Sequence, residues 1–339
     1  MSRKFELPTL LNYLDQRLSI RDLNYFAIQD CLDEQSQNVL LQHMKNIAPY
    51  NPFYVKNFLK FYISIIESCK EELLDDFYIF ACDGSILNAK ENKPTDSDLL
   101  AYYTEGNERD TTQGNQGKIL TWESPRLLLD QGSTGQRTWD ASLYLANFLN
   151  NNGFNLHEKR VCELGAGTGV VSLSLSKFYK KHGHIKEIIA TDGDANFLQR
   201  FQEILSLNQT PSNVPIEKMR LAWGSTRSDD IDVFYALPEV DTIVASDVTY
   251  DSDILAPLCS TIRDFFSRGC SNAIIASTIR KVSTMQEFHK ELDAHFKGNW
   301  KIIDRCEKPS DLQYKCCFKA QAPAMQIYQI DNNRIIHSK

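Results

Sequence analysis

Several features that would place this chain of 339 residues in other classes of protein are missing from it. No stretch approaches about 18 uninterrupted apolar residues, so the sequence predicts no membrane-spanning helix. The first eight residues, MSRKFELP, contain no apolar signal core. The nine cysteines form no C-x-x-C pair, and His182 and His184 have no ligand cluster beside them. We therefore expect no metal site, and reduced cysteines in a cytoplasmic protein.

Long basic runs are also missing. The 37 basic and 44 acidic side chains give a formal net charge of −7. Sequence-independent binding to nucleic acid relies on clustered Lys and Arg, so the composition disfavours a direct nucleic-acid partner. A hydrophobic content of 42% and a charged content of 24% predict a globular chain. The sequence gives no indication of an oligomer, and we take a monomer as the default.

Glycine is absent before Gly84. The first 90 residues instead place apolar side chains at helical spacing, most clearly from Asn57 to Leu73. We expect residues 1–90 to form a helical accessory domain that either packs on the rest or recognises a protein substrate. Residues 91–118 are rich in Asn, Thr, Asp, Gly, Gln and Glu and predict a polar linker or loop. Residues 119–339 are then expected to form the second domain.

Apolar strands and amphipathic helices alternate in that second part. This alternation predicts an α/β fold with a doubly wound, mostly parallel sheet covered on both faces. A helix is expected over 138–150, capped by Thr138. Residues 300–306 and 313–319 are expected to pair as a hairpin at the end of the sheet, with residues 324–330 as a further edge strand. The parallel strands are predicted near 160–164, 187–192, 217–222, 241–246 and 272–279.

The most informative segment runs from Val161 to Gly169 and reads VCELGAGTG. A buried strand is predicted to end at Glu163, and a helix to begin near Gly169, with glycines that permit positive φ and close approach to a ligand. The spacing is G-x-G-x-G and differs from the G-x-G-x-x-G of dinucleotide sites. Glu163 would repel a phosphate but suits a cationic ligand, and S-adenosylmethionine carries an ammonium and a sulfonium.

Ligand-type residues also follow the other predicted strands. Asp192 ends the second strand, where an acid can accept hydrogen bonds from ribose hydroxyls; the alternative is a turn residue, and Asp194 is expected to cap the next helix. Trp223 is expected either to wall in the adenine or to be a core residue with its N–H satisfied. Asp247 and Tyr250 follow the strand 241–246 and would lie over the same crevice, or act only as a loop acid and a rim aromatic.

The glycine loop, Asp192 and the expected terminal hairpin resemble the seven-β-strand (class I) methyltransferases. Residues 246–250 (SDVTY) are similar to the Asp-x-x-Tyr motif of the protein-lysine methyltransferases in this class, and residues 137–146 (RTWDASLYLA) resemble the members that modify elongation factor 2. This resemblance implies a seven-stranded sheet and a lysine facing Asp247 and Tyr250. It also implies that S-adenosylmethionine is lined by Trp139, Gly165, Ala166, Gly167, Asp192, Trp223 and Ser246.

The expected chemistry is in-line displacement, in which an amine nitrogen attacks the sulfonium methyl. We assign Asp247 to orient the amine, with Tyr250 assisting; a strict general-base role is disfavoured because a carboxylate with a pKa near ~3.9 is a poor acceptor from ammonium. Alternatives are a class I methyltransferase acting on another protein, RNA or a small molecule, a non-catalytic methyltransferase-like scaffold, and a nucleotide-dependent oxidoreductase.

Overall fold

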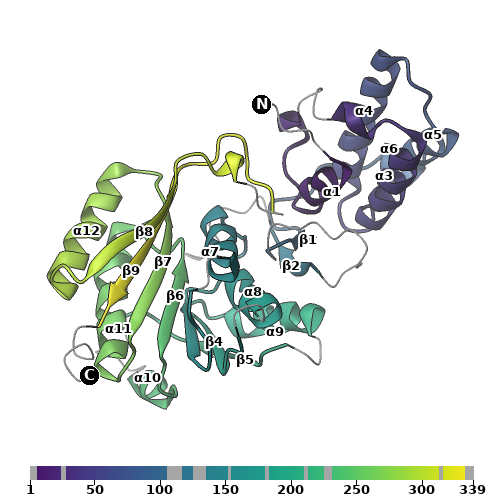
Figure 1. Ribbon diagram of the computed structural model, residues 1–339. Coiled ribbons are helices and arrows are strands. Elements are labelled where there is room, and N and C mark those ends of the chain that lie inside the picture. Colours follow the sequence, from purple (N-terminus) through teal and green to yellow (C-terminus); the bar gives the residue numbers. More distant parts are fainter. Residues whose placement is uncertain are drawn as a thin grey trace.

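The computed structural model describes residues 6–23, 28–104, 117–124, 135–151, 154–179, 183–209, 213–224, 231–312 and 316–332. Figure 1 shows a group of N-terminal helices beside a larger body built on one sheet, with a two-stranded ribbon between them. Among the described residues, no helix is both long enough and apolar enough to cross a membrane.

The N-terminal group confirms the helical prediction for this part of the chain. Asp33 and Asn51 cap α3 and α4 by accepting hydrogen bonds from backbone N–H groups of their first turns. Fully buried rings of Phe58, Tyr62 and Phe77 stack at the centre of this group. The helices are α1 (Leu7–Asp15), α3 (Glu34–Ile47), α4 (Pro52–Cys69), α5 (Asp75–Ala81) and α6 (Gly84–Leu87).

The ribbon corrects the prediction of a linker over 91–118. Strand β1 (Asp98–Tyr102) lies inside that range and pairs antiparallel with β2 (Ile119–Glu123). Leu100 and Tyr102 are buried in the core of the larger body. The polar composition of the whole range concealed one short strand whose apolar side chains do find a core. Residues 105–116 of the predicted linker lie outside the described part.

The main sheet has seven strands in the order β5-β4-β3-β6-β7-β9-β8. The first five are parallel and β9 is antiparallel to both of its neighbours. The predicted α/β class and the mostly parallel sheet are confirmed. The strands are β3 (Arg160–Leu164), β4 (Glu187–Asp192), β5 (Ile216–Arg220), β6 (Thr242–Ser246), β7 (Asn272–Thr278), β8 (Trp300–Cys306) and β9 (Met325–Asp331).

Helices cover both faces because successive side chains of a strand point to opposite sides. Val161 of β3 faces the core under α7 (Asp140–Asn151), α8 (Val170–Phe178) and α9 (Phe197–Asn208). Its neighbour Cys162 faces the core under α11 (Leu255–Ser267) and α12 (Val282–Phe296). The sequence analysis missed a short further helix on this second face, α10 (Ile231–Ala236).

The predicted terminal hairpin is wrong. Strand β8 pairs with β9, not with residues 313–319, and β9 lies inside the sheet while β8 forms its edge. Residues 316–319 are not in a strand, and 313–315 lie outside the described part. Cys316 and Phe318 are buried in the core under α7 instead, so their apolar pattern arises from packing of a connection.

Candidate active site

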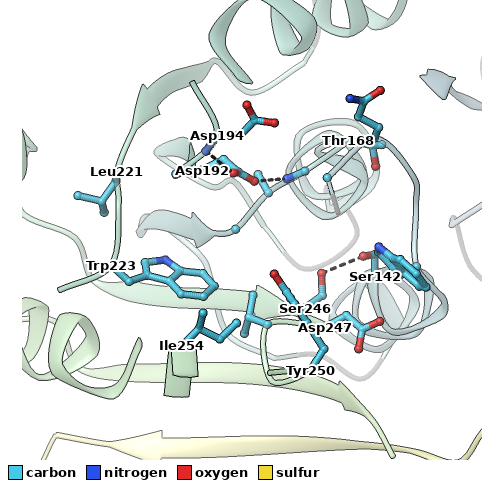
Figure 2. A pocket seen from close by; sticks show the side chains of 18 of the residues that line it. Ser142, Thr168, Asp192, Asp194, Leu221, Trp223, Ser246, Asp247, Tyr250 and Ile254 are labelled. Carbon is cyan, nitrogen blue, oxygen red and sulfur yellow. Dashed lines mark hydrogen bonds between the residues drawn. The ribbon is translucent and has the colours of Figure 1, made fainter. Parts of the chain in front are cut away.

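A hollow lies where the strand order reverses, between β3 and β6. This is the position at which open α/β sheets bind ligands. The hollow measures about 490 Å³, within the range of small-molecule sites. Its walls come from the loops that follow β3, β4, β5 and β6 and from the segment that enters α7 (Figure 2).

The glycine loop after β3 presses main chain against the hollow. Gly165 has φ of +68°, and a Cβ there would lie 2.9 Å from Val248 Cγ1 and 3.0 Å from Trp223 Cζ2. Any side chain at this position would be strained and would push into residues that line the cavity. Ala166 and Gly167, predicted from the sequence to contact the cofactor, also line the hollow.

Glu163 and Gly169, both predicted to contact the cofactor, are not among the residues that line the hollow. The Glu163 carboxylate is buried and accepts hydrogen bonds from Ser172 N, at 2.9 Å, and from Ser172 Oγ, in the first turn of α8. Burial raises the pKa of Glu163 to about 7, against the lowering effect of those hydrogen bonds. Gly169 lies against Phe201, whose ring would be 2.0 Å from an added Cβ. Both residues support the glycine loop on its side away from the hollow, through α8 and Phe201.

Asp192 and Asp194 lie at one end of the hollow, with Asp247 and Tyr250 at the other (Figure 2). Asp192 accepts hydrogen bonds from Gly167 N and Asp194 N, both at 2.9 Å, and burial raises its pKa. These bonds fix a carboxylate at the edge of the cavity. Asp194, predicted to cap the next helix, is not the cap of α9, because Asn196 holds that position. Asp194 instead accepts a hydrogen bond from Asn196 N at 2.8 Å in the preceding turn and pairs with Arg200 at 2.7 Å.

Trp223 and Ser246 line the hollow from the ends of β5 and β6. The indole Nε1 of Trp223 is buried, with no hydrogen-bond partner among the described residues. Trp223 also packs against the core under α11 and α12, so it borders both the hollow and the core. Ser246 Oγ lies 2.9 Å from Ser142 Oγ (Figure 2). Ser142, from the first turn of α7, is a lining residue that the sequence analysis missed.

Trp139 lines the hollow and has two guanidinium groups near its ring. The guanidinium carbons of Arg137 and Arg280 each lie 4.9 Å from its ring centroid, a separation at which a cation and an indole attract each other. Thr138, predicted to cap α7, has a different partner. Its hydroxyl lies 2.6 Å from the buried Glu123 carboxylate and 2.7 Å from the hydroxyl of Thr168 in the glycine loop.

The Asp247 carboxylate forms an ion pair with the guanidinium of Arg280. Arg280 Nη1 and Nη2 lie 2.9 and 2.5 Å from its two carboxylate oxygens, and the Asp247 side chain is only 4% exposed. Asp247 has φ of +55°, a strained conformation of a kind that clusters at functional sites. Tyr250 is 44% exposed and stands at the mouth of the hollow. The sequence analysis missed Arg280.

No group of three or more His, Cys, Asp or Glu side chains in the described part of the chain is arranged to hold a metal ion. The hollow is lined by the glycine loop, by aromatic side chains, by carboxylates at both ends and by an exposed phenol. It presents no Ser-His or Cys-His pair among the residues that line it. The arrangement suits a transfer reaction that proceeds by alignment of two bound reactants.

A sequence model described as lysine methyltransferase matches residues 126–295. The chain belongs to this lysine methyltransferase family. Two similar proteins named protein-lysine N-methyltransferase EFM3 come from Saccharomyces cerevisiae, 27% identical over 81% of this chain and 84% of that protein, and from Chaetomium thermophilum, 30% identical over 50% of each. Human protein-lysine N-methyltransferase EEF2KMT is 24% identical over 86% of this chain and 87% of its own length. This lysine methyltransferase uses S-adenosylmethionine as its methyl donor.

Proposed function

We propose that this enzyme is a protein-lysine N-methyltransferase that modifies a lysine ε-amine of elongation factor 2. The observation that carries the proposal is the position of Asp247 and Tyr250 in the wall of the hollow, across from the glycine loop. Their spacing is that of the Asp-x-x-Tyr motif in methyltransferases acting on protein lysines. The choice of elongation factor 2 is supported by the motif at residues 137–146 and by the alignment with human EEF2KMT along most of both chains.

The described residues fit the cofactor in several respects. Gly165, Ala166 and Gly167 would hold the amino-acid part against main chain, because a side chain at Gly165 would fill the space. Asp192 would accept hydrogen bonds from the ribose hydroxyls, using lone pairs that Gly167 N and Asp194 N leave free. Trp223 would wall in the adenine with its indole face and offer an unpartnered N–H donor.

Trp139 and Ser246 would complete this cofactor wall. Glu163 and Gly169 are left out of it, since they lie behind the loop. Glu163 instead holds the first turn of α8, where an acceptor satisfies N–H groups that have no partner within the helix. The cofactor, when bound, supplies an electrophilic methyl group on sulfur.

The chain's contribution to the chemistry is to align and prepare the amine. A lysine ammonium has a solution pKa near ~10.4 and must lose its proton before attack. Partial removal from water favours that loss. Asp247 would orient the amine and stabilise the positive charge that grows on nitrogen as the methyl is transferred, and Tyr250 would assist with its hydroxyl or ring face. Orientation of this kind supplies up to about 7–11 kcal/mol in favourable systems.

The proposal extends to the helices of residues 1–90, which we assign to recognition of the protein substrate. It also places the enzyme in the cytoplasm as a monomer, where its proposed target works. The nine free cysteines agree with a reducing compartment.

The test is transfer of labelled methyl to purified elongation factor 2, compared among three variants. Asp247→Ala should lower transfer by about 100-fold or more while S-adenosylhomocysteine still binds in calorimetry. Gly165→Arg should abolish that binding, because the side chain would fill the cradle. Asp253→Ala, which removes an exposed acid six residues after Asp247, should change neither quantity. Transfer by Asp247→Ala near the wild-type rate would contradict the assigned role.

A further inference from the structure

The proposed partner of the substrate amine is already occupied. Both oxygens of Asp247 face the two terminal nitrogens of Arg280, and the carboxylate is almost closed off from water. A bidentate guanidinium pair of this kind is among the stronger interactions of a carboxylate. It neutralises the charge that would attract an incoming lysine ammonium. Substrate and Arg280 therefore compete for one carboxylate.

The Arg280 side chain is able to leave Asp247 without movement of the backbone. Its side chain is 36% exposed, and it lies in the short connection between the end of β7 at Thr278 and the start of α12 at Val282. The guanidinium already stacks on Trp139. Leaving Asp247 therefore requires rotation of one long side chain and no movement of a helix or strand.

Asp140 provides the alternative negative charge. It stands at the start of α7, where burial raises its pKa while the charges of Lys319, Arg137 and Arg280 favour its ionised form. The same carboxylate favours the charged form of Arg280. Arg280 thus lies within electrostatic reach of two carboxylates, of which only Asp247 lines the hollow.

We propose that Arg280 is a positioning residue that holds Asp247 in the substrate-free enzyme and is displaced from it by the ammonium of the incoming lysine. The inference rests on the proposed function, because it requires Asp247 to face the amine. Displaced Arg280 remains against Trp139, which its guanidinium already contacts. Substrate binding then includes the cost of opening one ion pair, whereas methyl transfer itself takes place after that pair has opened.

The test measures KM for the protein substrate and kcat in Arg280→Gln, Arg280→Lys and wild-type enzyme. In Arg280→Gln, KM for the protein substrate should fall about fivefold, as expected for removal of one partly exposed ion pair. The kcat of this variant should stay within about twofold of the wild-type value. Arg280→Lys restores the competing charge and should return KM toward the wild-type value. Lys281→Gln, which removes the exposed neighbouring charge, is the matched control and should change neither constant.

Two further measurements separate the explanations. Calorimetry with S-adenosylhomocysteine should give an unchanged Kd in every variant, because Arg280 does not line the hollow, and thermal melting checks the fold. A fall in kcat with KM unchanged would overturn displacement, since Arg280 would then belong to the reacting complex. Unchanged KM and kcat in Arg280→Gln would overturn it as well. Failure of the wild-type enzyme to methylate elongation factor 2 would instead contradict the proposed target, and the same comparison of KM then applies to the protein that is labelled in a lysate.

Discussion

Glu163 makes the stability of this enzyme depend on pH in a direction opposite to that of an ion-paired carboxylate. The residue is 1% exposed, and burial raises its pKa from 4.5 to about 7. The folded protein therefore holds this proton more tightly than the unfolded chain does. The resulting stability is fully present below pH 4.5 and is lost as the pH rises through 7.

The magnitude follows from the size of this shift. At about 1.4 kcal/mol per pKa unit, the shift corresponds to about 3 kcal/mol in full, of which about 2.5 kcal/mol is lost between pH 5 and pH 8. Glu163→Gln removes the titration and keeps an oxygen that can accept the hydrogen bond from Ser172 N. The free energy of unfolding of the variant should therefore gain on that of wild type by about 2.5 kcal/mol over this range.

Urea unfolding at pH 5, 6, 7 and 8 measures both proteins under the same conditions. Asp140 and Asp192, whose pKa values are also raised by burial, titrate in both proteins, so the difference between the two curves reports Glu163 together with its coupling to Asp192. The same substitution at the exposed Glu217 controls for the change of side chain. A difference between wild type and Glu163→Gln that stays constant from pH 5 to pH 8 would refute the assignment of a buried, unpaired carboxyl.

Three other substitutions test the surroundings of the hollow. Gly169→Ala places a Cβ 2.0 Å from the Phe201 ring at positive φ and should lower the free energy of unfolding by about 2–4 kcal/mol in urea. Trp223→Ala should weaken S-adenosylhomocysteine about tenfold in calorimetry, with little change in melting temperature, because the lost face lines the cavity. Thr138→Val removes the hydroxyl that bonds Glu123 and should cost about 1–2 kcal/mol in the same unfolding assay.

The parallel strands could be located from the sequence because they are buried on both faces and appear as short apolar runs. Strands β3 and β4 were placed at their observed bounds, and β6 and β7 differ from the prediction by one residue at one end. The position of β9 was not predictable in this way. Its apolar run marks a buried strand, but only the pairing with β7 on one side and β8 on the other places it inside the sheet. The order of segments in the sequence instead favoured a hairpin between residues 300–306 and 313–319, which follow each other along the chain.

The candidate site divides along the same line. Residues such as Gly165, Asp192 and Asp247 lie directly at strand ends, so local pattern located them. Arg280 lies 33 residues after Asp247 in the sequence, and no local pattern joins the two. The orientation of the Glu163 side chain also could not be predicted from the sequence. Its carboxylate points toward α8 and away from the cavity.

The N-terminal helices are joined to the glycine loop by contacts between buried groups. Arg17 pairs with Asp98 of β1, with exposed fractions of 5% and 1%. Asp98 lies opposite Glu123 in the ribbon, and Glu123 accepts hydrogen bonds from Thr138 N and Oγ1. Thr138 in turn contacts Thr168 of the glycine loop. Breaking a buried ion pair leaves an uncompensated charge, so the helices cannot separate from the ribbon without cost. A protein docked on these helices, as proposed above, would therefore act on a unit that is physically continuous with the proposed methyl-donor site.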